Sequence, residues 1–410
     1  MVKLSLSKDK IRILLLEGVH ENAVREFHEA GYNNVELLPH ALGEAELVEK
    51  IQGVHMLGIR SATKLTDKVL AAANRLFCVG CFCIGTNQVR LDTARRAGIP
   101  VFNAPYSNTR SVAELVIGEI VMLLRGIPDK SRLAHEGKWL KSAKDSFELR
   151  GKTLGIVGYG HIGSQLSVMA EAMGMRVRYF DTEKQLAIGN AQPCSKLKEL
   201  LSISDVVTLH VPATPQTKNM IGEKELRAMR KGSYLINASR GNVVVIEALV
   251  KALEDKHLLG AAIDVFPSEP GSNADAFDSP LRGLSNVILT PHVAGSTHEA
   301  QANIGLEVAE KLIKYSDNGS TFGAVNFVEV SLPVKASGGR FLHIHANVPG
   351  MLRRINELFS SRNLNVSAQY LQTDPEVGYV VVDIDGEVDE AEVMAELQAL
   401  EGTIRARYLY

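Results

Sequence analysis

The sequence predicts an α/β protein with two doubly wound, Rossmann-like domains and a C-terminal ferredoxin-like βαββαβ module. Three observations support this prediction. Short apolar runs alternate with helical patterns over most of the chain, a glycine-rich turn joins one such run to a helix, and the pattern changes after residue 337. The 410 residues are too many for one ordinary core, so two or three domains are expected.

The composition is that of a soluble globular protein, with 45% hydrophobic and 22% charged residues. A net charge of −2 provides no basic field for nucleic acid or for an anionic membrane. The most hydrophobic helical stretch, residues 112–124, contains Glu114 and Glu119 and is too short to span a bilayer. Residues 1–10 are charged and lack the apolar core of an export signal, so we expect a cytoplasmic protein.

The four cysteines are too few for a disulfide framework. Cys78, Cys81 and Cys83 lie in a strand-like run, and their spacing is not repeated as it would be in a zinc site. We interpret them as buried thiols in a reducing compartment and expect no metal. A redox or metal role is the alternative.

The first region of the chain shows five apolar runs separated by helical patterns, as in a doubly wound sheet. The expected strands are residues 11–16, 35–38, 55–59, 77–83 and 101–102. The expected helices are residues 20–30, 44–51, 65–73 and 91–97. A long amphipathic pattern at residues 299–315 is expected to return to this region. The first domain is therefore expected to be discontinuous, with residues 1–107 and 300–336.

The glycine-rich turn Gly158-Tyr159-Gly160-His161-Ile162-Gly163 indicates a dinucleotide site. A strand is expected before it at residues 153–157, a helix after it at residues 164–173, and a further strand at residues 176–180 that ends in Asp181. The glycines permit a tight turn, approach of a pyrophosphate and close packing of helix on strand. A carboxylate at position 181 would repel a 2′-phosphate, which favours NAD over NADP. Residues 108–299 are therefore the expected NAD-binding domain.

Three polar residues, Arg240, Glu269 and His292, follow strands expected at residues 234–237, 260–264 and 287–290. Taken singly, each is more often a solvated or structural residue. Open α/β sheets, however, bind ligands at the carboxyl ends of their strands, where these three residues can act together.

These residue types supply what hydride transfer at a secondary alcohol needs. His292 can take the hydroxyl proton. Glu269 can orient the imidazole and favour its protonated form. Arg240 can hold a substrate carboxylate with two parallel hydrogen bonds and polarise the developing carbonyl.

The C-terminal module follows a flexible break, Ser337-Gly338-Gly339, and spans residues 339–410. The expected strands are residues 340–348, 366–371, 378–384 and 403–409, and the expected helices are residues 350–362 and 389–400. The alternation in the first of these strands predicts burial of one face only, and the acidic run from residue 383 to residue 396 predicts a solvated surface.

The chain resembles the D-isomer-specific 2-hydroxyacid dehydrogenases, in the branch that carries a C-terminal ACT module. The resemblance extends over essentially the whole chain and rests on several segments: residues 80–88, 102–105, 107–114, 158–163, 237–241, 264–270, 291–297 and 402–407. It implies oxidation of 3-phosphoglycerate by NAD⁺ to 3-phosphohydroxypyruvate, the entry step of L-serine synthesis. It also implies a homotetramer, inhibition by L-serine at the ACT module and, in some members, reduction of 2-oxoglutarate.

The resemblance also implies site residues. The cofactor contacts would be Gly158, Gly160, His161, Ile162, Gly163, Asp181, Ala238, Ser239, Arg240, Asp264, His292, Val293, Ala294 and Gly295. The substrate contacts would be Arg60, Ser61, Asn108 and Lys141, and the serine contacts His345, Asn347 and Asn365. The simpler interpretation of Arg60 is a solvated charge, and that of the serine contacts is polar residues of turns and strands.

Two other functions stay open. Ala62 stands where this family usually has arginine, which leaves room for another 2-hydroxy acid such as glyoxylate or 2-hydroxyglutarate, whereas Arg60 favours a phosphorylated substrate. A non-catalytic NAD-sensing protein with the same fold is the other alternative. The complete set of Arg240, Glu269 and His292 argues against it.

Overall fold

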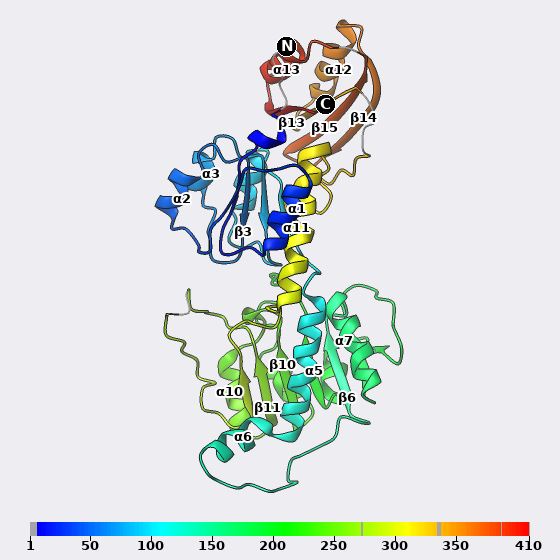
Figure 1. Cartoon of the computed structure of the whole chain (residues 1–410). Helices are drawn as coiled ribbons and strands as arrows, with labels where there is room; N and C mark the ends of the chain where they lie inside the picture. The colour runs from blue at the N-terminus through cyan, green and yellow to red at the C-terminus, as the bar shows by residue number, and fades with distance from the viewer. Residues whose placement is uncertain (1–5, 272–273, 334–337, 387, 410) are drawn as a thin grey trace. The chain divides into compact units, whose positions relative to one another are not determined.

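The computed structural model describes residues 6–271, 274–333, 338–386 and 388–409. The chain forms two compact units, one of residues 1–107 with 301–410 and the other of residues 108–300, and each is described by itself (Figure 1). Ser337 of the expected flexible break lies outside the described residues. No helix in the described part of the chain is long and apolar enough to cross a membrane.

The first part of unit 1 is a five-stranded parallel sheet with strand order β2-β1-β3-β4-β5. The strands are β1 (Ile13–Leu15), β2 (Val35–Leu37), β3 (Met56–Ile59), β4 (Cys78–Cys81) and β5 (Val101–Asn103). The connecting helices are α1 (Glu21–Glu29), α2 (Glu44–Lys50), α3 (Asp67–Ala72) and α4 (Leu91–Arg96), after a short η1 (Lys8–Lys10). Strands β1, β3 and β4 are buried along their whole length, as is typical of a parallel sheet covered on both faces.

Helix α11 (His298–Asn318) begins near the end of unit 2, and most of its length belongs to unit 1. Its apolar residues Ile304, Val308 and Leu312 share one core with Phe27 of α1 and Phe102 of β5. The helix thus packs on a sheet whose last strand, β5, ends at Asn103, far earlier in the chain.

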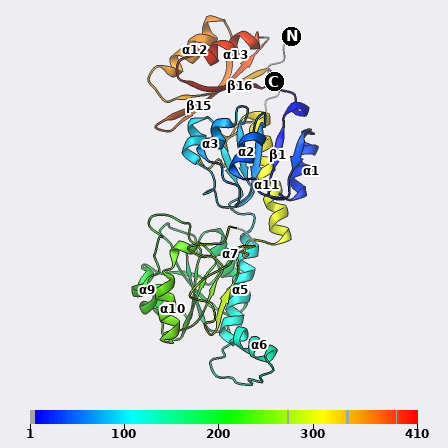
Figure 2. The ribbon, with the colours of Figure 1, turned by 90° about the vertical axis from the view of Figure 1, so that its left-hand side faces the viewer.

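Unit 2 is built on a seven-stranded parallel sheet with strand order β12-β11-β10-β9-β6-β7-β8. The strands are β6 (Thr153–Val157), β7 (Arg176–Phe180), β8 (Gln192–Pro193), β9 (Val206–Leu209), β10 (Ser233–Asn237), β11 (Leu258–Ile263) and β12 (Val287–Leu289). The helices are α5 (Thr109–Arg125), α6 (Ile127–His135), α7 (His161–Ala172), α8 (Leu197–Ile203), α9 (Glu223–Ala228) and α10 (Ile246–Glu254), with a short η2 (Gly241–Val243). Helix α5 runs along this sheet in both views (Figures 1 and 2) and packs against β10, β11 and β12.

The C-terminal module is a four-stranded antiparallel sheet, strand order β14-β15-β13-β16, with two helices on one face (Figures 1 and 2). Its elements are β13 (Gly339–Ala346), α12 (Met351–Ser361), β14 (Asn365–Thr373), β15 (Val377–Asp385), α13 (Glu390–Ala399) and β16 (Thr403–Leu409). The predicted βαββαβ order and the α/β fold class are both confirmed.

Two expectations about this module are wrong. Strand β13 is buried on both faces, because the segment after α11 covers the face that the helices leave open. In that second core, Phe327 and Leu332 pack with Leu342 and Tyr379. The acidic run is also not wholly solvated: Asp383 is buried, and two hydrogen bonds from the guanidinium of Arg340, at 2.6 and 2.7 Å, compensate for the burial of its charge.

Candidate active site

The glycine-rich turn has the shape that close approach of a phosphate requires. Gly158 has a φ of +90°, and a Cβ there would lie 2.2 Å from the carbonyl oxygen of His210. A Cβ at Gly163 would lie 2.3 Å from the carbonyl oxygen of Gly158, so only glycine lets α7 pack this closely. Gly160 differs, because the space around its missing side chain is open. The turn therefore leaves room for a pyrophosphate at the N-terminus of a 12-residue helix.

Asp181 lies beside this turn, directly after β7. Its Oδ2 accepts a hydrogen bond from the N–H of Tyr159 at 2.7 Å, and its Oδ1 accepts one from the N–H of Glu183 at 2.9 Å. Rossmann folds bind the adenosine ribose with an acid at this position. The charge disfavours a further phosphate there, so the residues fit NAD better than NADP.

The loop after β10 holds Arg240 at the carboxyl edge of the sheet. Asn237 organises this loop: its Oδ1 accepts hydrogen bonds from the backbone and the hydroxyl of Ser239, and its Nδ2 donates to the carbonyl of Arg240 at 3.0 Å. A Cβ at Gly241 would lie 2.0 Å from the backbone of Phe266. The loops after β10 and β11 are therefore in direct contact, which brings the charge of Arg240 close to the residues that follow β11.

His292 and Glu269 form a hydrogen-bonded pair at the same edge, with 2.8 Å between Nδ1 and Oε2. The other carboxylate oxygen, Oε1, accepts a hydrogen bond from the N–H of Phe266 at 3.1 Å. The bond to Glu269 raises the pKa of His292, against the effect of burial. Burial alone would raise the pKa of Glu269, but the hydrogen bonds from His292 and Phe266 outweigh it and lower this pKa. The pair is therefore poised to carry an imidazolium beside a carboxylate.

Asp264 fixes the loop that carries His292. Its carboxylate accepts hydrogen bonds from the hydroxyl of Thr290 at 2.6 Å, from the N–H of Val293 at 2.8 Å and from the N–H of Ala294 at 2.9 Å. Its main-chain carbonyl accepts the N–H of His292 at 2.8 Å. His292 has a φ of +55°, a conformation that these four bonds impose on a non-glycine residue.

A second buried carboxyl, Glu119 of α5, interacts electrostatically with Asp264. Both of its oxygens are buried without a hydrogen-bond partner. Burial, reinforced by the negative charge of Asp264, raises the pKa of Glu119 to about 8. The sequence showed Glu119 only as an interruption of an apolar helix. The residues next to Glu119 in the sequence give no indication that it interacts with Asp264, which holds the loop of His292.

The other predicted cofactor and substrate residues of unit 2 occupy different environments. Ala238 and Ser239 are buried at the end of β10, and Gly295 lies against Asn108, because a Cβ at Gly295 would be 2.1 Å from Asn108 Nδ2. Lys141 is exposed in the segment between α6 and β6. Unit 2 therefore brings the glycine turn, Asp181 and the residues after β10, β11 and β12 to one sheet edge, whereas Lys141 lies in a loop outside this edge.

The predicted substrate residues Arg60 and Ser61 belong to unit 1, where they follow β3. The main chain of Arg60 is held on both sides: its N–H donates to Glu17 Oε1 at 3.0 Å, and its carbonyl accepts a hydrogen bond from Gln88 Nε2 at 2.7 Å. The sequence did not predict that Glu17 or Gln88 would hold the main chain of Arg60. A glutamate before a glycine at a strand end looks like a solvated turn residue in the sequence.

The three residues predicted to bind serine do not form one site within the chain. His345 pairs with Gly378 and Asn365 pairs with Asp385, so the two lie seven residues apart along β15. At 3.3 Å per residue this is roughly 23 Å. Asn347 lies near His345: its Nδ2 donates to the carbonyl of Asp374, the residue directly after β14, at 2.7 Å.

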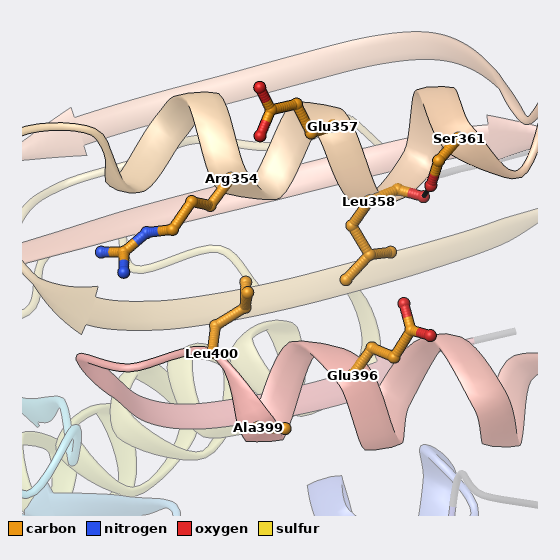
Figure 3. Close-up of a pocket in the computed structure, with 7 residues that line it drawn as sticks. All are labelled: Arg354, Glu357, Leu358, Ser361, Glu396, Ala399 and Leu400. Atoms are coloured by element: carbon orange, nitrogen blue, oxygen red, sulfur yellow. Dashed lines mark hydrogen bonds between the residues drawn. The ribbon is translucent and has the colours of Figure 1, made fainter.

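Two hollows lie on the C-terminal module. One, of about 460 Å³, is lined by Asn365 and other amides, among them Asn356 and Gln369. The other, of about 450 Å³, lies between α12 and α13, where Leu358 and Leu400 face each other and Arg354 and Glu357 point away from its centre (Figure 3). The hollow between the helices contains none of the predicted site residues.

Comparison with known proteins assigns the family. Residues 117–294 match the model of the D-isomer specific 2-hydroxyacid dehydrogenase NAD binding domain, and residues 341–405 match an AHAS small subunit-like ACT domain. The chain belongs to the D-isomer-specific 2-hydroxyacid dehydrogenase family. Within it, a relative from Escherichia coli that is 58% identical over the full length of both chains is a D-3-phosphoglycerate dehydrogenase. A protein of that name from Haemophilus influenzae is 56% identical and aligns with 100% of this chain and 99% of its own length.

Solved structures show the same family fold. The D-lactate dehydrogenase of Aquifex aeolicus, complexed with NAD and lactic acid, is 27% identical with a TM-score of 0.64, covering 74% of this chain and 95% of that one. The NAD-complexed D-isomer specific 2-hydroxyacid dehydrogenase of Lactobacillus delbrueckii is 28% identical with a TM-score of 0.66, covering 77% of this chain and 100% of that one.

Proposed function

We propose that this chain is an NAD-dependent dehydrogenase that oxidises D-3-phosphoglycerate to 3-phosphohydroxypyruvate, the first step of L-serine synthesis. The observation that carries the proposal is the hydrogen-bonded pair of His292 and Glu269, 2.8 Å apart at the sheet edge that also holds the glycine turn. The substrate is proposed from the names of full-length relatives that are 56–58% identical.

Each residue of the trio has a distinct role in this proposal. Bound NAD⁺ supplies the acceptor for the hydride that leaves C2 of the substrate. His292 takes the hydroxyl proton at Nε2, since Nδ1 is engaged by Glu269. The O–H electron pair then forms the carbonyl, and Glu269 stabilises the imidazolium. Arg240 binds the substrate carboxylate and the oxygen on which charge develops.

The proposal is tested by replacing the proton acceptor. His292→Ala should lower kcat for 3-phosphoglycerate oxidation by about 10²–10⁴-fold. The dissociation constant of NADH, measured by fluorescence titration, should stay close to that of the wild type. Unchanged turnover would show that His292 does not move the proton.

The substrate assignment depends on Arg60 and Ser61, with Asn108 and Lys141 as further proposed contacts. NADH oxidation should be measured with 3-phosphohydroxypyruvate, 2-oxoglutarate, glyoxylate and pyruvate. We expect the highest kcat/KM for the phosphorylated acid, because Arg60 offers a charge-assisted hydrogen bond to a dianion. We also expect weaker reduction of 2-oxoglutarate. A preference for an unphosphorylated acid would contradict the assignment.

L-serine is the proposed effector of the ACT module, bound between two copies of the chain. Since His345 and Asn365 lie at opposite ends of the sheet, a ligand that uses both must take one from each copy. His345→Ala and Asn365→Ala chains, isolated as a pair with one chain of each kind, should therefore regain one of the two serine sites of a wild-type pair. Each variant alone should have none. Recovery of no sites would contradict a site shared between copies.

We further propose that the enzyme is a cytoplasmic homotetramer. All four cysteines are free thiols, which supports a reducing compartment. Trp139 has 89% of its surface exposed beside Lys141, which supports burial of this loop in an assembly. Sedimentation equilibrium measures the assembly directly, and a monomer at micromolar concentration would contradict it.

A further inference from the structure

Glu17 occupies a junction between three strand ends in unit 1. It follows β1 by two residues, and its N–H donates to the carbonyl of His40, beyond β2, at 3.1 Å. Its neighbour Leu16 donates to the carbonyl of Gly58 in β3 at 2.9 Å. The φ of Glu17 is +63°, a left-handed conformation that is unfavourable for a side chain with a Cβ. An unfavourable backbone at a strand end points to a requirement for this side chain's position.

The carboxylate of Glu17 is bound by the main chain of the loop after β3. We call residues 60–63 the substrate loop. Oε1 accepts hydrogen bonds from the N–H of Arg60 at 3.0 Å and of Thr63 at 2.8 Å, and Oε2 accepts one from the N–H of Ala62 at 2.9 Å. Three converging N–H groups form an anion-binding nest, and here the protein's own carboxylate fills it.

The same loop is fixed at two further points. Gln88 Nε2 donates to the carbonyl of Arg60 at 2.7 Å, so both sides of this residue's main chain are held. Arg60 Nη1 donates to the main-chain carbonyl of Glu17 at 3.4 Å, which limits the directions that the guanidinium can take. Four hydrogen bonds thus hold the main chain of the substrate loop: three to the carboxylate of Glu17 and one from Gln88. They fix the orientation of Arg60 and its neighbours, and Glu17 adopts a strained backbone conformation in this arrangement.

We propose that Glu17 is a positioning residue for the substrate: its carboxylate holds the substrate loop in the shape that presents Arg60 and Ser61 to an anionic 2-hydroxy acid. The proposal rests on the proposed function, in which Arg60 binds the substrate. It has a consequence for specificity. Since the N–H groups of Arg60, Ala62 and Thr63 are occupied by Glu17, these three donors are not available to the substrate, and the side chains of Arg60 and Ser61 are left to bind its anionic groups.

Two substitutions test this role. Glu17→Gln keeps the size of the side chain and replaces one acceptor oxygen by an NH₂ group that opposes an N–H donor. Glu17→Gly removes the carboxylate and is free of strain at a φ of +63°. The matched control is Glu36→Gln, in the same unit, because the carboxylate of Glu36 forms ion pairs with Lys50 and Arg12 rather than with the substrate loop.

In both Glu17 variants, KM for 3-phosphoglycerate should rise about tenfold, the effect of losing one charge-assisted hydrogen bond. The kcat should stay within about twofold, since the proton acceptor belongs to the other unit. The dissociation constant of NADH should not change. Amide exchange should accelerate at residues 60, 62 and 63, and Glu36→Gln should show none of these effects.

Other outcomes overturn the proposal. A normal KM in Glu17→Gly shows that the loop needs no carboxylate. A fall in kcat and NADH affinity, with faster exchange throughout unit 1, shows a general structural role. If the wild type prefers an unphosphorylated 2-keto acid, the substrate assignment fails, but Glu17 is still tested, because the KM comparison is then made with that acid.

Discussion

Nδ1 of His292 lies 2.8 Å from Oε2 of Glu269, and the N–H of Phe266 donates to the other oxygen of the same carboxylate at 3.1 Å. The carboxylate is thus fixed by the main chain before it orients the imidazole. This leaves Nε2 as the nitrogen that can exchange a proton with a substrate, and it determines how the reaction should respond to pH.

The pair predicts a shift in the pH profile of Glu269→Gln. Glu269 raises the pKa of His292 above 6.5, and oxidation needs the neutral imidazole, so the oxidation rate rises as the pH passes through the raised pKa. Reduction needs the imidazolium and declines over the same range. Without the carboxylate, both limbs should move to lower pH. The measurement is kcat/KM against pH in both directions, and unmoved limbs would show that another group titrates.

Asp181 predicts the cofactor preference. Asp181→Asn removes the negative charge and keeps an oxygen that can accept the N–H of Tyr159. The variant should use NADP better and NAD less well, because the repulsion of a 2′-phosphate is lost. The ratio of kcat/KM for the two cofactors is the measurement, with Glu183→Gln as the control for a neighbouring exposed charge. An unchanged ratio would mean that position 181 does not contact the ribose.

Substitution of Gly163 should affect mainly stability, whereas substitution of Gly160 should affect mainly NAD binding. Gly163→Ala places a Cβ 2.3 Å from a carbonyl oxygen and should lower the free energy of unfolding by about 1–3 kcal/mol. Gly160→Ala meets open space and should change stability by less than about 1 kcal/mol. It should still weaken NAD binding, because its methyl group occupies the pyrophosphate approach. Urea denaturation and NADH titration separate the two effects; equal losses of stability would contradict this reading of the turn.

Glu119 predicts a stability that falls with rising pH. The pKa of this carboxyl is 4.5 in the unfolded chain and about 8 in the folded one, so folding favours the protonated form. The contribution of Glu119 to the free energy of unfolding is therefore full below pH 4.5 and is lost as the pH rises through 8. The upper limit is about 5 kcal/mol at 1.36 kcal/mol per pKa unit. In Glu119→Gln, the loss of stability between pH 5 and pH 8 should shrink by about 3 kcal/mol. Exposed Glu114→Gln, on the same helix, should leave this loss as it is.

The buried pair of Arg340 and Asp383 predicts a large cost of disruption. Asp383→Asn leaves a buried guanidinium without a counter-charge and should destabilise the C-terminal module by about 3–5 kcal/mol. Glu357→Gln breaks an exposed pair with Arg353 and should cost less than about 1 kcal/mol. Calorimetry of the full chain measures both. If the two variants unfold at similar transition temperatures, Asp383 is not needed to neutralise Arg340.

Much of the fold could be predicted because its signals are local. Apolar runs identified the buried strands, and glycine spacing located the turn before α7. Elements with weak local signals were missed. Strand β8 has only two residues, Gln192 and Pro193, and a proline is unusual in a strand.

The candidate site could be predicted only in part. Its residues follow strands, but the contacts between Glu269 and His292, 23 residues apart, or between Glu17 and a loop 45 residues later, depend on the order of strands in the sheet. Burial of Glu119 and Asp383 was equally hidden, since it depends on what packs against them. The roles of the site residues stay predictions until the variants are measured.

The apolar cover on the second face of the C-terminal sheet also bears on how such chains exchange parts during evolution. The glycines at 338 and 339 look like a natural point for recombination, but Phe327, Val330 and Leu332, which pack on the sheet, lie before them. A gene fragment encoding only residues 339–409 would deliver a sheet with a bare hydrophobic face to its new host. The unit that can be transferred intact therefore begins near the end of α11. A successful recombination must include the segment with Phe327, Val330 and Leu332.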